Sequence, residues 1–182
     1  LIQKDDLYES NRQLDTNLAS DYLIFTPDCP VWKLGEKTLD SPFLVSFITS
    51  PAVHNFNVQT REEIRDVHHE RIKKILYCAI CNGVKNIILG AYGCGAFHNN
   101  PEDVANSFKY WLVDQNLKDY FESISFSIIE RKDRRINQSL KNIDVFANVF
   151  NLSVIETEEF VQNKKKVSKE KERKNKNKKT VK

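Results

Sequence analysis

The sequence predicts an α/β fold with a largely parallel central sheet, and three observations support this. Apolar runs of strand length occur at 43–50, 86–91 and 123–129. Two segments with apolar residues at helical spacing, 60–82 and 101–116, lie between these runs. An alternation of three strands and two helices requires right-handed crossovers, which make the strands parallel and leave helices on both faces of the sheet.

The region before this alternation is less regular. Residues 1–20 are polar with scattered leucines, and they predict helix or irregular structure. The run YLIF at 22–25 is apolar, and we expect the segment TPDCP that follows to break it, because its prolines interrupt regular structure. A short strand is predicted at 31–34, closed by a turn near Gly35.

The first strand and first helix of the alternation have clear limits. FLVSFITS at 43–50 is apolar almost throughout, as a strand buried on both faces should be, and Pro51 ends it. The helix at 60–82 has an apolar stripe opposite charged residues. Gly83 follows as the glycine that typically comes just after a helix end.

The stretch NIILGAYGCGAFHNN at 86–100 is the most informative part of the chain. A β-branched run is followed by three of the five glycines, and then Asn100 and Pro101 begin a helix as N-cap and first helical residue. Strand, glycine loop and helix form the layout of a phosphate cradle, in which backbone N–H groups converge on an anion. The spacing matches neither the dinucleotide fingerprint nor the P-loop, so a simple chain turn remains an equal alternative.

The C-terminal half completes the prediction. SISFSII at 123–129 is the third strand, 131–142 is a charged connection, and 143–150 is a short helix capped by Asn142. Residues 154–161 could form a last element.

Three loops follow the predicted strands, at 49–56, 90–100 and 130–142. In parallel sheets ligands bind at the carboxyl ends of the strands, so we expect a site where these loops meet. The sequence predicts no cofactor and no metal.

Reactive side chains have structural interpretations that we favour over chemical ones. Cys78 and Cys81 form CxxC near the end of a helix without a second ligand pair, which favours buried structural thiols over redox or zinc chemistry. His68 and His69 lie mid-helix among charges, which favours a solvated helix face over a metal site. Cys94 lies between two loop glycines, and we favour a backbone role over that of a nucleophile.

The aromatic residue after the glycines has two interpretations. From the residues alone, Phe97 could pack into the core or cover a sugar, and core packing is favoured. His98 beside it could contact a phosphate or lie exposed.

Composition indicates an intracellular protein, cytoplasmic or nuclear, because no apolar run reaches membrane-spanning length and there is no secretory signal. The four cysteines are therefore expected to be free thiols. The chain begins with Leu1 and contains no Met, which predicts a fragment or a processed chain.

Charge divides the chain into two parts. Residues 164–182 hold eleven Lys or Arg against two Glu, whereas the rest is net negative although the whole chain is +3. This tail has too few apolar residues to fold and should be disordered. It could bind nucleic acid or another polyanion, serve as a nuclear localisation signal, or simply improve solubility.

Several segments together resemble the microbial-type poly(ADP-ribose) glycohydrolase family. YLIFTPDCPVWK resembles the family's "SPDVPVF" segment, and NIILGAYGCGAFHNNPEDVANSF resembles "LVLGAWGCGVFGNDP–VA–F" closely. PFLVSFITSPAVHN also resembles the family's "PF-V-V-T-APA-N" strand, and NIDVF resembles its closing "N–AF".

The resemblance implies a macrodomain-like three-layer α/β/α sandwich over residues 1–162, lacking its N-terminal strands, followed by the disordered Lys-rich tail at 163–182. It further implies a ligand-binding site in which a run of loop residues holds the diphosphate of ADP-ribose and the next lies against the ribose beside the scissile bond. The diphosphate residues are Gly93, Cys94, Gly95 and Ala96, and the ribose residue is Phe97.

One departure limits what the resemblance implies about catalysis. Family members carry a Gly-rich stretch followed by Gln-Glu-Glu, with a glutamate as general acid, and this sequence has no such motif. Cleavage of a glycosidic bond needs a positioned acid and an activated water. We therefore expect an ADP-ribose-binding part of a hydrolase of ribose–ribose O-glycosidic bonds, inactive alone, with ADP-ribose or poly(ADP-ribose) on modified proteins as partner and no membrane. The alternatives are a non-catalytic ADP-ribose reader and a polyanion-binding protein that acts through its tail.

Overall fold

The computed structural model describes residues 21–54, 60–129 and 141–152. One compact unit, Leu1–Phe150, contains every helix and strand described below. The predicted boundary at residue 162, the tail and the element at 154–161 lie outside the described residues, as does most of the connection at 131–142. Among the described helices, none has both the length and the apolar character needed to cross a membrane.

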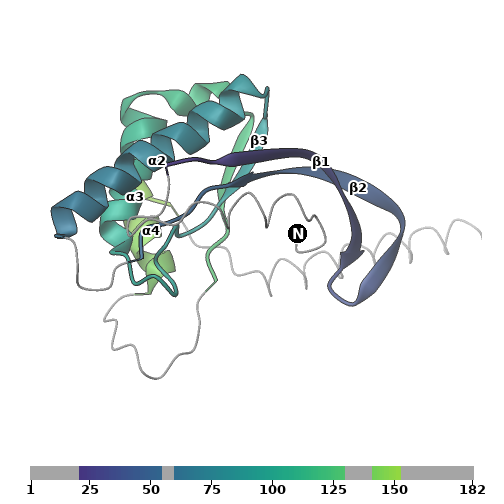
Figure 1. Cartoon of the computed structure of the whole chain (residues 1–182), viewed down its shortest axis with the longest axis horizontal. Coiled ribbons are helices and arrows are strands. Elements are labelled where there is room, and N and C mark those ends of the chain that lie inside the picture. The colour runs from purple at the N-terminus through teal and green to yellow at the C-terminus, as the bar shows by residue number, and fades with distance from the viewer. Residues whose placement is uncertain (1–20, 55–59, 130–140, 153–182) are drawn as a thin grey trace, which may run out of the picture. The chain divides into compact units, whose positions relative to one another are not determined.

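The first elements of the described residues are β1 (Ile24–Leu34) and β2 (Lys37–Thr49), which form a long antiparallel hairpin (Figure 1). Two residues connect the strands, and Gly35 adopts a φ of +63° in that turn. So short a connection between adjacent strands allows only antiparallel pairing. The prediction that 43–50 enters a parallel sheet is therefore wrong for the described residues.

The break expected after 22–25 is also absent. β1 continues through both prolines, and the pairing register shifts between Thr26 and Cys29, where Asp28 has a φ of +50°. The prolines are tolerated because a bulge and an edge strand need fewer ladder hydrogen bonds.

The predicted crossover is confirmed by the second sheet. β3 (Asn86–Leu89) pairs in parallel with β4 (Ser123–Phe126), and α3 (Pro101–Lys109) lies between them in sequence. Within the described residues β2 is not hydrogen-bonded to β3, so there are two two-stranded sheets, of which one is parallel, in place of one largely parallel sheet.

Local chemistry accounts for the helix limits. α2 (Arg61–Cys81) begins with a capping box between Thr60 and Glu63. Gly83, with a φ of +69°, follows its end as predicted.

The second predicted helix is present but changes type along its length. Asn100 caps α3 by accepting hydrogen bonds from the amides of Glu102 and Asp103. The chain continues as a π-helical turn, η1 (Tyr110–Asp114), and then a 3-10 turn, η2 (Leu117–Tyr120).

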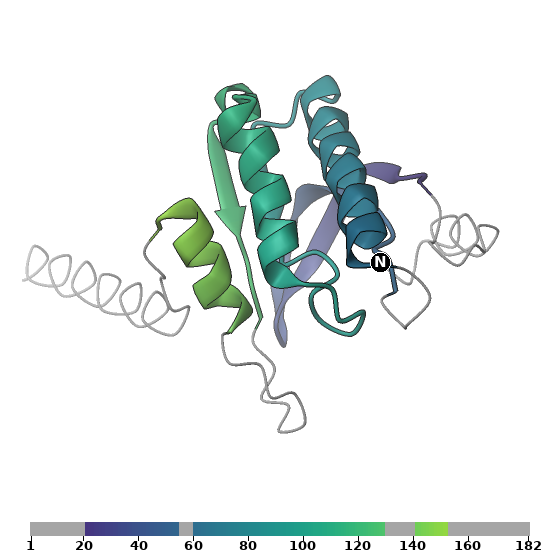
Figure 2. The same ribbon diagram turned by 90° about the vertical axis from the view of Figure 1, so that its left-hand side faces the viewer.

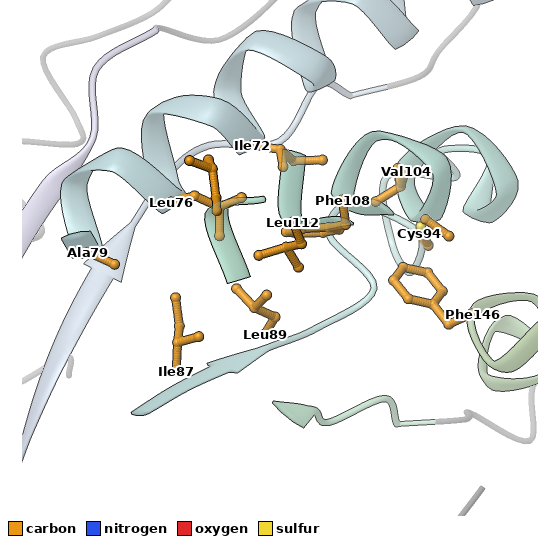
Figure 3. Close-up of a cluster of buried hydrophobic side chains, with 12 residues drawn as sticks. Ile72, Leu76, Ala79, Ile87, Leu89, Cys94, Val104, Phe108, Leu112 and Phe146 are labelled. Carbon is orange, nitrogen blue, oxygen red and sulfur yellow. The ribbon is translucent and has the colours of Figure 1, made fainter. Parts of the chain in front are cut away.

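The C-terminal helix of the unit is α4 (Asn142–Phe150), in which Asn142 is the first helical residue. Helices α2, α3 and α4 lie side by side beside the parallel strands (Figure 2). Apolar side chains from the three helices and from β3 meet in one cluster (Figure 3). Its least exposed members are Ile72, Leu76, Ala79, Val104, Ala105 and Phe108. This cluster fixes the strand and the helix on either side of the glycine loop.

Candidate functional site

The loop between β3 and α3 folds as two successive turns. The amide of Cys94 donates to the carbonyl of Ala91 at 3.0 Å, and the amide of His98 donates to that of Gly95 at 3.1 Å. The intervening amides of Gly95, Ala96 and Phe97 donate to no acceptor in the described part of the chain. Consecutive amides that are left open in this way are the groups from which an anion-binding nest is built.

The two central glycines of the loop have opposite surroundings. Gly93 has a φ of +73°, and a Cβ there would collide with the Asn99 amide and come within 2.9 Å of the Ala52 Cβ. A Cβ on Gly95 would meet nothing within 4 Å. Gly93 is therefore required to fold the loop, whereas Gly95 leaves open space above the free amides.

The aromatic residue after the nest lies at the surface. Phe97 is 39% exposed, and its ring meets the His54 ring edge-on, with 5.0 Å between centroids. The prediction of core packing for Phe97, made from the residues alone, is therefore wrong. The two turns of the loop leave Gly95, Ala96 and Phe97 exposed, so Phe97 lies on the outer edge of the loop.

Cys94 belongs to the loop through its backbone and to the core through its side chain, which lies in the apolar cluster (Figure 3). Burial, with a smaller contribution from the negative charge of Asp103, raises the pKa of its thiol to about 12. A thiol that stays protonated at neutral pH is a poor nucleophile, which agrees with a backbone role.

The glycine loop forms one wall of the candidate site. The segment that follows β2, Ser50 to His54, forms the second wall. The side-chain amide of Asn99 donates to the carbonyls of Val53, at 2.7 Å, and Gly93, at 3.0 Å. One side chain thus joins this segment to the glycine loop.

Two further side chains hold the start of the same segment. The hydroxyl of Tyr92 donates to the carbonyl of Pro51 and lies 3.1 Å from the hydroxyl of Ser50. The guanidinium of Arg71, only 2% exposed, donates to the same Pro51 carbonyl at 3.0 Å and to Asp21 at 3.1 Å. Lys74 also donates to Asp21, at 3.2 Å, and the hydrogen bonds from Lys74 and Arg71 lower the pKa of Asp21.

The prediction of a solvated face for His68 is wrong. His68 is 2% exposed, its Nδ1 lies 3.0 Å from the carbonyl of Ile64, and its Nε2 lies 3.4 Å from the amide of Val53. Burial lowers its pKa to about 4. The sequence does indicate this burial, because His68 follows Ile64 by four residues and precedes Ile72 by four, on the buried stripe of α2.

Solved structures of bacterial enzymes match this chain in both fold and sequence. A mutant of poly(ADP-ribose) glycohydrolase from Thermomonospora curvata is 31% identical over 80% of this chain, with a TM-score of 0.68. The same enzyme bound to the inhibitor ADP-HPD is 30% identical over 79%, with a TM-score of 0.68. Poly(ADP-ribose) glycohydrolase from Deinococcus radiodurans in complex with ADP-ribose is 27% identical over 82%, with a TM-score of 0.66.

The resemblance to the microbial poly(ADP-ribose) glycohydrolase family is confirmed. This chain spans 55% and 54% of the two Thermomonospora chains and 60% of the Deinococcus chain. No protein-family model and no curated protein matches it.

Against the glycohydrolase pattern, the loop has one informative difference. The family segment quoted above reads Ala-Trp-Gly-Cys-Gly, and this chain has Tyr92 in place of the tryptophan. Tyr92 places a hydroxyl on the Pro51 carbonyl, so the contact between the loop and the second wall is polar here.

The two cysteines of CxxC are not buried as predicted. Cys78 is half-buried and Cys81 is exposed, because both lie in the last turn of α2, where the buried stripe ends. All four cysteines are free thiols. Within the described ranges, no three side chains of His, Cys, Asp or Glu are grouped to hold a metal ion.

Proposed function

We propose that this chain is the ADP-ribose-binding part of a poly(ADP-ribose) glycohydrolase-like protein that hydrolyses ribose–ribose O-glycosidic bonds. The observation that supports it most is the open nest of amides at Gly95, Ala96 and Phe97, with free space above Gly95. Similar structures hold ADP-ribose or the inhibitor ADP-HPD. A diphosphate is the anion that such a nest would accept.

The backbone from Gly93 to Ala96 takes the diphosphate in this proposal. The N-terminus of α3 is not the phosphate site, because the Asn100 side chain already accepts hydrogen bonds from the first free amides of that helix. Binding therefore depends on the shape of the loop. The side chain of Cys94 faces the core and its amide donates to the Ala91 carbonyl, so this residue contributes only to the shape of the loop.

Phe97 lies against the ribose next to the diphosphate. Its ring stands at the exposed rim of the loop and is supported from one side by His54. An aromatic ring provides a flat apolar surface for a sugar ring at little cost in side-chain entropy.

The catalytic acid has no counterpart in this sequence, which lacks the Gln-Glu-Glu motif. Asp103, in the first turn of α3, accepts hydrogen bonds from the Arg61 guanidinium at both carboxylate oxygens, at 2.7 and 2.9 Å. It therefore has a structural role. We expect the 182-residue chain to bind ADP-ribose without releasing it from polymer. Turnover by the purified chain would contradict this account of the acid.

Calorimetry with ADP-ribose tests the binding proposal. Gly95→Val fills the space above the nest with a branched side chain, and we expect at least a hundredfold loss of affinity. Gly90→Ala is the matched control, because a Cβ there makes only an ordinary contact, 3.6 Å from the Ser127 carbonyl. Equal affinity of the Gly95→Val variant and the wild type would refute the assignment of the loop.

Calorimetry separates the first alternative from the proposed function, and a hydrolysis assay separates the second. A polyanion-binding protein would lose binding when residues 164–182 are deleted and would keep it in Gly95→Val. A non-catalytic reader would bind through the loop, and a longer form of the protein would also fail to hydrolyse polymer.

A further inference from the structure

The second wall of the site is held at one fully buried residue. Val53 is 0% exposed, and its two backbone polar groups are paired with side chains instead of a strand or helix ladder. Its amide faces Nε2 of His68 at 3.4 Å, and its carbonyl accepts from Asn99 at 2.7 Å. A buried amide that loses its acceptor destabilises the fold, so His68 is needed there as the acceptor for the Val53 amide.

The orientation of His68 is itself fixed. Nδ1 donates to the carbonyl of Ile64 at 3.0 Å, which leaves the lone pair of Nε2 directed at the Val53 amide. The ring meets the Tyr92 ring edge-on at 5.2 Å, and Tyr92 in turn bonds the Pro51 carbonyl. The lowered pKa of His68 agrees with this neutral tautomer.

Two features of the site depend on where Val53 lies. The next residue is His54, whose ring supports Phe97. The side-chain amide of Asn99 donates to the carbonyls of both Val53 and Gly93. A shift of Val53 would therefore break one of the two hydrogen bonds that hold Asn99 against the loop.

We propose that His68 is a positioning residue for the ADP-ribose site: by accepting the hydrogen bond of the Val53 amide, it holds His54 against Phe97 and keeps Asn99 on the glycine loop. The residue touches no ligand and acts through Val53. This inference rests on the proposed function for its effect on binding, while the contact between His68 and Val53 can be tested without ligand.

The experiment compares substitutions at two adjacent histidines. His68→Leu keeps the volume and removes the acceptor, whereas His68→Gln places an amide oxygen within reach of the Val53 amide. His69→Leu is the matched control, because the His69 ring packs on Tyr110 and Trp111, away from Val53. Two quantities are measured for each: ADP-ribose affinity by calorimetry and exchange of the Val53 amide by NMR.

We expect His68→Leu to weaken ADP-ribose binding about tenfold and to speed exchange at Val53 at least tenfold. His68→Gln should restore both quantities to within threefold of the wild type, and His69→Leu should change neither. If the leucine variant does not fold, His68→Asn replaces it, because its shorter side chain cannot reach the Val53 amide.

Other results have distinct meanings. Wild-type affinity and wild-type exchange in a folded His68→Leu variant would overturn the inference. Failure of the glutamine variant to restore either quantity would also overturn the inference. The loss in His68→Leu would then not come from the missing acceptor. If the wild type does not bind ADP-ribose but exchange at Val53 still depends on the acceptor, the proposed function fails and the contact stands.

Discussion

The apolar core and the candidate site are adjacent but are held together by different forces. The cluster around Phe108 consists mainly of apolar side chains from three helices and β3, so its stability comes from buried area, which has no preferred direction. The site is held by buried polar groups, His68, Arg71 and Asn99, that bond specific carbonyls and amides. We conclude that the core decides whether the unit folds, whereas the polar contacts decide the shape of the loop.

The largest effect is expected from a change confined to the core. Phe108 is 1% exposed and packs against the rings of Phe126 and Phe146, with centroids 5.3 and 6.5 Å away. Phe108→Ala should lower the free energy of unfolding by about 3–5 kcal/mol, through lost transfer energy and the cavity left behind. Urea denaturation measures the loss. The fraction that remains folded should bind ADP-ribose with wild-type affinity, and a large loss of affinity there would contradict the separation of the two regions.

The core and helix ends were predictable from the sequence because they follow local rules. The apolar spacing of α2 and the Asn100 and Pro101 signals for α3 depend on neighbours within a turn. The hairpin is harder to predict, because only the two-residue connection between Leu34 and Lys37 indicates that the two strands pair.

The polar contacts were harder to predict for a physical reason. Asn99 and Val53 are 46 residues apart, and Arg71 and Pro51 are 20 apart, so no local pattern links them. The prediction for His68 is wrong because polar residues among charges are usually solvated, and this one is not. Its position on the apolar stripe of α2 was the better guide.

The second largest effect concerns the polar region and depends on pH. The pKa of His68 is about 4 in the folded protein, against about 6.5 in an unfolded chain. Between these values the unfolded chain binds a proton that the folded protein does not, so stability is present above pH 6.5 and is lost as the pH falls to 4. The loss should reach about 3 kcal/mol for this group.

Denaturation at several pH values, compared between the wild type and His68→Gln, isolates this contribution. The charged groups around His68 act in opposite directions, Arg71 lowering its pKa and Asp103 raising it, and burial is the larger cause. Asp21 titrates below this window because its pKa is already lowered. Parallel pH profiles for the two proteins would show that His68 is not buried as a neutral group.

An intermediate effect should separate the two loop glycines. Gly93→Ala places a Cβ against Asn99 at a φ of +73° and should cost about 2 kcal/mol of stability. Gly95→Ala meets no neighbour and should leave the free energy of unfolding within about 0.5 kcal/mol. Thermal unfolding of both variants measures the contrast. Equal destabilisation would mean that the space above Gly95 is filled in the folded protein.

The smallest effect is expected at Cys94, the residue that belongs to both regions. Its side chain lies in the core, so Cys94→Ala should cost about 1 kcal/mol for the small cavity it leaves. Its backbone lies in the loop and is unchanged by the substitution, so ADP-ribose affinity should stay within twofold of the wild type. Urea denaturation and calorimetry on the same preparation give both numbers.

The unmodified Cys94 thiol gives an independent check of the same division. With a pKa of about 12 it should resist alkylation at pH 8 in the folded protein, whereas the exposed Cys81 should react, as mass spectrometry of a partly alkylated sample would show. A Cys94 that reacts as fast as Cys81 would place its sulfur at the surface of the loop. The core would then lose a member, and the loop would gain a side chain at the position where we propose that only backbone meets the ligand.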